Sequence, residues 1–281
     1  MGAGCNDRAP ARRTDASSPT DTASPTATPT RTPADFEVAY EHPTSVEIGT
    51  TISVTLVVTN TGGRAARFSA PLSVQRPGDT WRTAPTREFG TIEPGETVRA
   101  DSRPYELQYL GRYAFRLGAS APTATIRTRP ATLAWGRAYR TPAGYRLRVD
   151  APDLERAYAY VDPDGIDRAR SAPGEQWAFV PLTASNPSEA VVTPPAADDV
   201  TLYPSETPYD RTALVERPLY QGQPYVATEL RPNGEIEGYV PYAIPAATSI
   251  DDLRVVWAAS TDRGDIAVSW QSRGVPPYRG G

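Results

Sequence analysis

The chain has 281 residues, 39% of them hydrophobic, with 30 prolines and 21 glycines, which suits one to three globular domains plus a polar segment and excludes a wholly disordered chain. Its 29 basic residues are all arginine and are outnumbered by 33 carboxylates. The formal net charge of -4 argues against the basic footprint of a nucleic-acid-binding protein.

Residue usage narrows the remaining classes. The lack of lysine, with abundant Ala, Asp, Arg, Thr and Pro, resembles the usage of haloarchaeal proteins. A single cysteine, Cys5, excludes an intrachain disulfide, and a single histidine, His42, excludes most histidine-based metal sites. No run of 18 apolar residues is present, so we predict no membrane-spanning helix.

The first residues indicate a lipid anchor. Ala3, Gly4 and Cys5 resemble the end of a lipobox, in which small residues precede a cysteine that becomes lipidated, although Gly2 stands where that pattern has an aliphatic residue. No charged and apolar leader precedes them, so we infer that the sequence was trimmed or that its start codon lies further upstream. The alternatives are a stray cysteine in a flexible tail and N-myristoylation, which the Asn at position 6 disfavours.

Residues 1–35 are predicted to form a disordered stalk. The chain from residue 7 to residue 35 is rich in Ser, Thr and Pro and has no apolar periodicity, so it cannot bury enough surface to offset its ordering entropy. A Pro-rich stalk of about 3.1 Å per residue would reach at most about 90 Å. The alternative is an ordinary disordered terminus.

Residues 36–130 are predicted to form a first β-sandwich. Short stretches with two-residue alternation, rich in Val, Thr, Ile, Tyr and Phe, are divided by Gly and Pro turns, which is typical of antiparallel sandwiches. The residues predicted to face the core are Ile52, Val54, Leu56 and Val58, and later Leu110, Tyr113, Phe115 and Leu117. The motifs VTNTGGRAA, GTIEPGETVRA and GRYAFRLG resemble extracellular immunoglobulin-like modules related to the CARDB group.

Residues 131–274 are predicted to form a second sandwich, followed by a flexible tail over 275–281. A long core strand carries Trp177, Phe179 and Leu182, and a strand with a bulge is expected over 233–245. The further predicted strands lie within 144–150, 198–211, 252–260 and 264–272.

The second segment resembles the DUF4352 family of prokaryotic lipoproteins and secreted proteins. The matching features are the strand that ends at Asn186, the pair Leu202 and Tyr209, and the strand from Gly234 to Pro245. The resemblance implies the immunoglobulin-like sandwich that is also seen in the mycobacterial MPT63 antigen. Pro181 and the pair at 194–195 depart from the family pattern, and because proline cannot donate to a ladder, we expect the core strand to be bulged or at an edge.

One pair of sequence motifs occurs twice in the chain, and we call it the repeated phrase. LVVTNTGGRAA is followed further along the chain by IEPGETV, and PLTASNPSEAV is followed by LRPNGEI. In each pair, an apolar strand stops at an Asn, and a Pro-containing turn introduces a later strand. The sequence therefore predicts an all-β fold: two tandem immunoglobulin-like antiparallel β-sandwiches after a disordered N-terminal stalk.

Residues that support catalysis are scarce. His42 is the sole base for a Ser-His arrangement, and its place before a proline favours a surface or strand-edge residue. The carboxylate pairs at 198–199 and 251–252 are interpreted as turn residues before strands. We therefore predict no enzyme.

Two weaker site predictions lie in the second segment. Asp162, Asp164 and Asp167 surround Gly165 in an oxygen-rich loop of the kind that binds calcium. The spacing departs from that of an EF-hand, and a simple turn is the favoured alternative. Some tyrosines of the second segment are candidates for a face that recognises a glycan or a protein, and half-buried packing is the favoured alternative. The candidate tyrosines are Tyr203, Tyr209, Tyr220, Tyr225, Tyr239 and Tyr242.

The sequence thus predicts an extracytoplasmic cell-surface protein, held at the membrane by a lipid on Cys5. Its two domains would act as a binding or structural module of the envelope, with an unidentified envelope protein or glycan as partner and no cofactor except calcium at the acidic loop. The alternative is a receptor that binds a glycan or cation through the tyrosines or the groove between the domains. A hydrolytic function is the third and weakest hypothesis.

Overall fold

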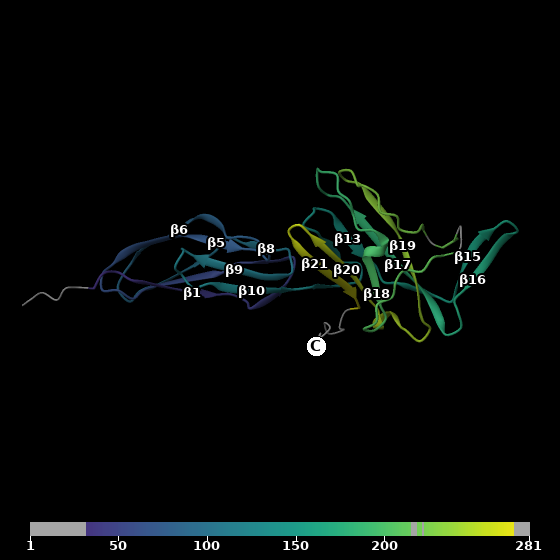
Figure 1. The fold of residues 1–281 in the computed structure, drawn as a ribbon, viewed down its shortest axis with the longest axis horizontal. Coiled ribbons are helices and arrows are strands. Elements are labelled where there is room, and N and C mark those ends of the chain that lie inside the picture. Colours follow the sequence, from purple (N-terminus) through teal and green to yellow (C-terminus); the bar gives the residue numbers. More distant parts are fainter. Residues whose placement is uncertain (1–31, 215–217, 221, 273–281) are drawn as a thin grey trace, which may run out of the picture.

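The computed structural model describes residues 32–214, 218–220 and 222–272. Cys5, most of the predicted stalk and the predicted tail lie outside these residues. The described residues form β-strands and two 3-10 helices of three residues each, which confirms the all-β prediction. Figure 1 shows two β-sandwich units arranged end to end. We call residues 36–130 the N-terminal unit and residues 131–272 the C-terminal unit.

The N-terminal unit consists of two sheets that pack around one core. One sheet has the order β1-β4-β7, the other has the order β2-β10-β9-β5-β6, and β3 pairs with β8. All pairs are antiparallel except that of β2 with β10. The strands are β1 (Phe36–Glu41), β2 (Ser45–Glu47), β3 (Thr50–Ile52), β4 (Thr55–Asn60), β5 (Ala66–Gln75), β6 (Arg82–Ile92), β7 (Thr97–Asp101), β8 (Tyr105–Leu107), β9 (Gly111–Leu117) and β10 (Ala124–Arg129).

The core of the N-terminal unit follows the predicted alternation with one exception. All four residues predicted within 51–58 are buried, although the stretch is divided between β3 and β4. On β9, Tyr113, Phe115 and Leu117 are buried as predicted. Leu110 is different: it lies before β9, is half-buried and packs against the core of the C-terminal unit. It is three residues from Tyr113 and so is out of phase with the two-residue alternation of β9, which begins at Gly111.

The C-terminal unit has a four-stranded sheet of order β11-β21-β20-β18 and a second sheet in which β17 lies between β13 and β14 on one side and β19 on the other. A separate hairpin is formed by β15 and β16. The strands are β11 (Ala131–Ala134), β12 (Ala138–Arg140), β13 (Arg146–Val149), β14 (Asp153–Glu155), β15 (Ala157–Asp162), β16 (Gly165–Arg170), β17 (Glu175–Ser185), β18 (Val200–Tyr203), β19 (Glu235–Pro245), β20 (Arg254–Thr261) and β21 (Gly264–Gln271).

Strand β17 contributes to two different cores. Its residues Trp177, Phe179 and Leu182 are all buried, as expected for a long core strand. Leu182 belongs to the main core, whereas Trp177 and Phe179 belong to a smaller cluster. Successive side chains of a strand point to opposite faces, so residues 179 and 182 cannot share one face. The sheet is therefore covered on both sides.

Pro181 lies in the middle of β17, which is a central strand and neither bulged nor at an edge. β17 and β19 pair without a register shift over their whole length, so the bulge predicted within 233–245 is also absent. The amide nitrogen of Asp150 donates to the carbonyl of Pro181. The backbone of Pro181 therefore faces the gap between the end of β13 and the start of β14, which both pair with the same side of β17. The proline is tolerated because its missing N–H points where no strand would accept it.

The repeated phrase forms the same structure in both units, which we call the Asn lock. In the N-terminal unit, the buried Asn60 ends β4, and its Nδ2 donates to the carbonyls of Arg64 (2.8 Å) and Ile92 (2.9 Å). Its Oδ1 accepts from the amide of Gly62 (3.0 Å). The backbone of Asn60 also pairs with the turn 93–96, which has Pro at its second position and Gly95 at φ 79°, as in a type II turn.

Asn186 makes the equivalent contacts in the C-terminal unit. Its Nδ2 donates to the carbonyls of Ala190 (2.7 Å) and Leu230 (2.9 Å), and its Oδ1 accepts from the amide of Ser188 (3.0 Å). Its backbone pairs with the turn 231–234, in which Asn233 takes the left-handed position at φ 60°. The turn motifs of the sequence thus fix how one strand ends and a distant strand begins.

The two units are joined by a packed junction. Ile48 and Tyr109 of the N-terminal unit are buried in the main core cluster of the C-terminal unit. The amide of Leu110 donates to the carbonyl of Asp265 (2.7 Å). β10 ends one residue before Pro130 and β11 begins one residue after it, so the connection has almost no slack.

The turn between β20 and β21 approaches the N-terminal unit closely at this junction. Gly264 has φ 133°, and a Cβ atom at this position would lie 3.1 Å from the Cβ atom of Tyr109. Glycine therefore permits both the backbone conformation and the close approach. The two units therefore pack directly against each other at the junction.

Candidate functional site

The predicted cation loop is the turn of the β15–β16 hairpin. The carboxylate of Asp162 accepts the amide of Asp164 (2.9 Å), which closes the turn. The two oxygens of Asp167 accept from the hydroxyl of Tyr160 (3.1 Å) and the amide of Arg168 (2.7 Å). Among the described residues, no three or more His, Cys, Asp or Glu side chains come together as a metal site would require. The loop has the geometry of the favoured alternative, a turn.

The six tyrosines of the predicted recognition face are dispersed. Tyr225, Tyr239 and Tyr242 are buried, whereas Tyr203, Tyr209 and Tyr220 are half-buried. In the main core, the hydroxyl of Tyr242 donates to the carbonyl of Val200 (2.7 Å), and that of Tyr225 donates to the carbonyl of Pro195 (3.2 Å). Burial raises the pKa of both phenols. The six residues therefore do not form one exposed face.

Part of the tyrosine set forms an outer core on the far face of β17 and β19. Tyr158, Trp177, Phe179 and Tyr239 cluster there, and the ring of Tyr220 stacks on that of Phe179 with centroids 3.8 Å apart. The hydroxyl of Tyr220 donates to Asp153 (2.6 Å), and burial together with this bond raises the pKa of Tyr220. This cluster packs the β15–β16 hairpin against the sheet.

The remaining sequence candidates make local backbone contacts. His42 follows β1, and its Nδ1 lies 2.9 Å from the carbonyl oxygen of Pro43. The two Asp pairs occupy short 3-10 helices, Ala197–Asp199 before β18 and Ile250–Asp252 before β20. In each, the carboxylate of the second Asp accepts a hydrogen bond from the backbone amide three residues earlier. The distances are 2.7 Å from Ala196 to Asp199 and 3.0 Å from Ser249 to Asp252. The interpretation of these pairs as turn residues before strands is confirmed.

A cavity in the N-terminal unit was missed by sequence reasoning. This N-terminal cavity has a volume of about 380 Å³ and lies between β5 and β6 on one side and the β7–β8 segment on the other. It is lined by Leu56, Leu72, Val74, Arg76, Arg82, Thr83, Ala84, Pro85, Thr86, Arg87, Ser102, Arg103, Pro104, Tyr105 and Phe115.

An irregular strand pair opens this cavity. Pro71 pairs with Thr86 and Ser73 pairs with Thr83, so that Leu72 alone faces both Ala84 and Pro85. The extra residue in β6 is a bulge, and bulges bend an edge strand away from its regular path. The prolines of the stretches SAPLS and RTAPT were the sequence signal for this irregularity.

A second cavity, of about 410 Å³, lies at the junction of the units. Tyr109 of the N-terminal unit lines it together with Tyr145, Trp257 and several polar residues of the C-terminal unit. It corresponds to the predicted groove between the domains. Tyr109, Tyr145 and Trp257 are themselves buried in the main core, so the groove lies at the edge of a packed interface.

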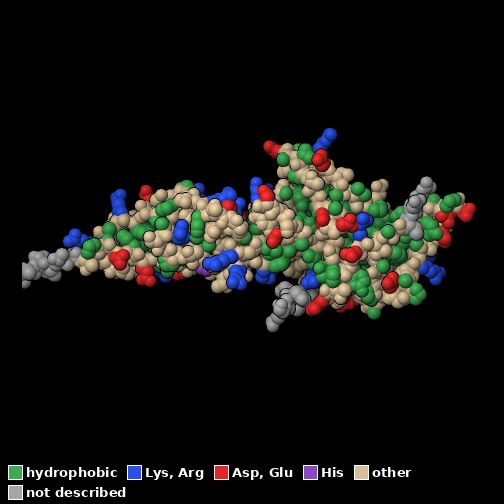
Figure 2. Space-filling view, viewed as in Figure 1, with side chains coloured by type: hydrophobic (Ala, Val, Ile, Leu, Met, Phe, Trp, Pro, Cys, Tyr) green, Lys and Arg blue, Asp and Glu red, His purple; other side chains and the backbone are tan. Residues whose placement is uncertain are grey.

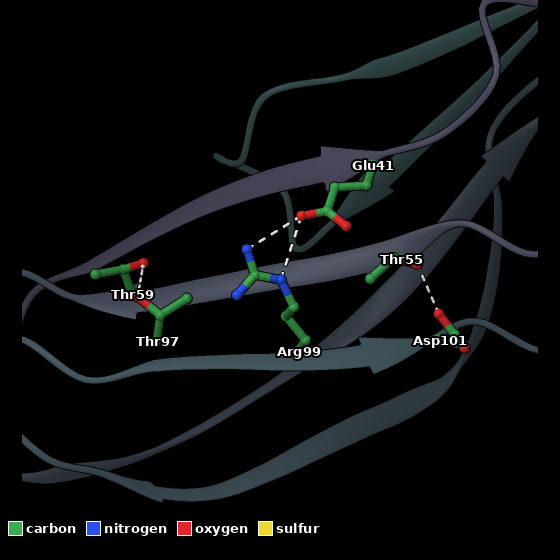
Figure 3. A network of polar contacts seen from close by, with 6 residues as sticks. All are labelled: Glu41, Thr55, Thr59, Thr97, Arg99 and Asp101. Carbon is green, nitrogen blue, oxygen red and sulfur yellow. Dashed lines mark hydrogen bonds and ion pairs between the residues drawn. The ribbon is translucent and has the colours of Figure 1, made fainter.

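The outer face of the β1-β4-β7 sheet is polar. Figure 3 shows cross-strand pairs on this face: Arg99 with Glu41 (3.2 Å), Thr59 with Thr97 (2.8 Å) and Thr55 with Asp101 (2.7 Å). Charged side chains of both signs are interspersed along both units on the face drawn in Figure 2. The sheet face of Figure 3 is therefore suited to contact with water.

Comparisons with known proteins identify no family for this chain. No family model and no curated protein matches the chain. An uncharacterized β-sandwich protein from Clostridium difficile 630 is 10% identical, with a TM-score of 0.31 over 50% of this chain and 94% of that one. A red sea bream transglutaminase is 14% identical, with a TM-score of 0.34 over 87% of this chain and 32% of that one.

The described residues include no helix with the length and hydrophobicity of a membrane span.

Proposed function

We propose that the protein is an extracytoplasmic surface protein, lipid-anchored through Cys5, whose two units act as a non-catalytic binding or structural head of the cell envelope. The packed junction is the observation that carries this proposal. Two sandwiches that bury side chains in a shared cluster present their surfaces as one stiff body. Such a head on a Ser/Thr/Pro-rich segment suits display at a distance from a membrane.

The organisation of the side chains supports a binding or structural role over catalysis. Nucleophilic or acid-base catalysis needs a base within hydrogen-bond reach of its partner. His42 bonds instead to a neighbouring backbone carbonyl, and the Asp pairs cap their own 3-10 helices. The resemblance to the DUF4352 and CARDB groups stays a prediction, and it agrees with an extracellular module.

The lipid anchor is tested by the intact mass of the native protein extracted from membranes. We expect a chain that begins at Cys5 and carries the added mass of a diacylglyceryl-type lipid. A matched Cys5→Ser variant should leave the membrane fraction, because the anchoring group has no other attachment point. An unmodified chain that retains Met1, or a variant that stays with the membrane, would contradict the proposal.

A further inference from the structure

The N-terminal cavity differs in its chemistry from the rest of the surface. Its floor is the open side of the sandwich core: Leu56 and Phe115 are buried there, and Leu72, Val74 and Tyr105 remain partly exposed. Covering partly exposed aliphatic side chains with an apolar group is favourable, because it removes apolar surface from water. The floor therefore favours a hydrocarbon ligand.

The rim of the same cavity is cationic. Arg76, Arg82, Arg87 and Arg103 line it, and the described lining residues include no Asp or Glu. This is a local reversal of the charge of the whole chain, which has a formal net charge of -4. A cavity with an apolar floor and an arginine-rich rim is complementary to an amphipathic anion.

The arginines retain donors for such a ligand. Arg82 is paired with Asp79 (2.9 Å), but in the described part of the chain no carboxylate lies within ion-pair distance of Arg76, Arg87 or Arg103. Arg76 uses its Nε to donate to the hydroxyl of Tyr105 (2.7 Å).

Arg87 uses one terminal nitrogen to donate to the backbone carbonyl of Asp101 (2.7 Å). The carboxylate of Asp101 is engaged elsewhere, with Thr55 on the outer face of the sheet. Because a guanidinium has five N–H donors in a planar fork, each of these contacts leaves donors for a carboxylate.

We propose that the N-terminal cavity binds a small amphipathic anion, namely a carboxylate with a medium-length hydrocarbon body. The hydrocarbon covers Leu72 and Val74, and the carboxylate lies among Arg76, Arg87 and Arg103. The volume of about 380 Å³ is near the lower end of the range for small-molecule sites, so the occupant is a single compact ligand. This site is independent of the lipid anchor and of any envelope partner.

The test is calorimetric titration of the purified full chain with decanoate, and with decanol as a neutral ligand of the same length. We expect saturable binding of decanoate at one site and binding of decanol at least about 10-fold weaker, because charge-assisted hydrogen bonds to the rim are lost. Added salt should weaken decanoate binding and leave decanol binding nearly unchanged.

Three variants locate the site. Arg103→Gln should weaken decanoate binding about 10-fold, whereas Arg67→Gln, an exposed arginine of β5 outside the cavity, should have no effect. Ala84→Trp places a large ring at an exposed position of the rim and should abolish binding while the unit stays folded by circular dichroism.

Two results would overturn the proposal. The first is that the folded chain does not bind decanoate. The second is that the Ala84→Trp and Arg103→Gln variants bind decanoate as tightly as the Arg67→Gln control. The titration uses soluble protein and does not depend on Cys5. Its failure would therefore leave the proposed envelope function untouched, and loss of the anchor would leave this site untouched.

Discussion

The two units end their central strands with the same Asn lock, yet they differ in what surrounds it. In the N-terminal unit, the segment between Asn60 and its turn forms the paired strands β5 and β6, and the irregular pairing of these strands leaves a cavity beside β6. In the C-terminal unit, the corresponding segment is longer, and part of it folds back along β19 and covers an outer aromatic core. The comparison teaches that the lock fixes where two strands meet, while the chain between them is free to build different surfaces.

The strongest test of this comparison removes the side-chain amide of the Asn in each lock. We expect Asn60→Ala and Asn186→Ala each to lower the free energy of unfolding by about 3 kcal/mol, because each leaves buried carbonyls without donors. Urea denaturation gives the magnitude, and hydrogen-exchange mass spectrometry shows which unit is affected.

The control for the amide pair is Thr59→Ala, which removes an exposed cross-strand bond beside the first lock and should cost less than about 1 kcal/mol. If either Asn variant is as mild as this control, the two locks are not equivalent and the comparison fails.

Alkaline pH should separate the units. Burial raises the pKa of two tyrosines in the N-terminal unit, Tyr40 and Tyr113, and that of Tyr113 rises to about 12 from an ordinary value of 10.0. In the C-terminal unit, burial raises the pKa of more tyrosines: Tyr139, Tyr145, Tyr225 and Tyr242. A raised pKa in the folded state gives stability that is complete below pH 10 and is lost as the pH rises, because the unfolded chain releases its protons first.

We therefore expect the C-terminal unit to open first above pH 10, and the N-terminal unit to lose about 1 to 2 kcal/mol between pH 10 and pH 12. Hydrogen exchange of each unit, followed with tyrosinate absorbance, measures the order. Simultaneous opening of both units, or earlier opening of the N-terminal unit, would show that the buried phenols do not distinguish them.

The smallest expected effect concerns the turn residues with positive φ. Gly95→Ala and Asn233→Ala should each cost about 1 kcal/mol, since both positions are left-handed. Asn233→Gly should change stability by less than about 0.5 kcal/mol, because glycine and asparagine both tolerate this conformation. Thermal unfolding of the three variants checks these values, and a tolerated Ala at either site would argue against a type II turn there.

Much of the fold was readable because it depends on local patterns. Two-residue alternation identified Ile52, Val54, Leu56 and Val58 as core residues, and all four are buried. The Asn and Pro-containing turns identified the repeated device. The predictions that failed depended on neighbours: Pro181 required knowledge of where β13 and β14 break, and Leu110 required knowledge of the adjoining unit.

The site residues show the same dependence on neighbours. Residue type alone named six tyrosines as candidates for a recognition face, with half-buried packing as the favoured alternative, and their burial depends on which sheet face each occupies and what covers it. The arginines at 76, 82, 87 and 103 lie just after β5, on β6 and in the segment after β7, so no sequence motif connects them.

The sequence by itself therefore determined the all-β class, the core-facing residues of the regular strands and the Asn and Pro-containing turn motifs, because each is a pattern within a few residues. The side-chain contacts of each Asn lock join Asn60 to Ile92 and Asn186 to Leu230, which are far apart in the chain. The tertiary structure alone decided the shared junction core, the outer aromatic core and the arginine-rimmed cavity. Each of these depends on long-range packing that brings distant strands together, and a strand pattern specifies which face is apolar without specifying what will cover it.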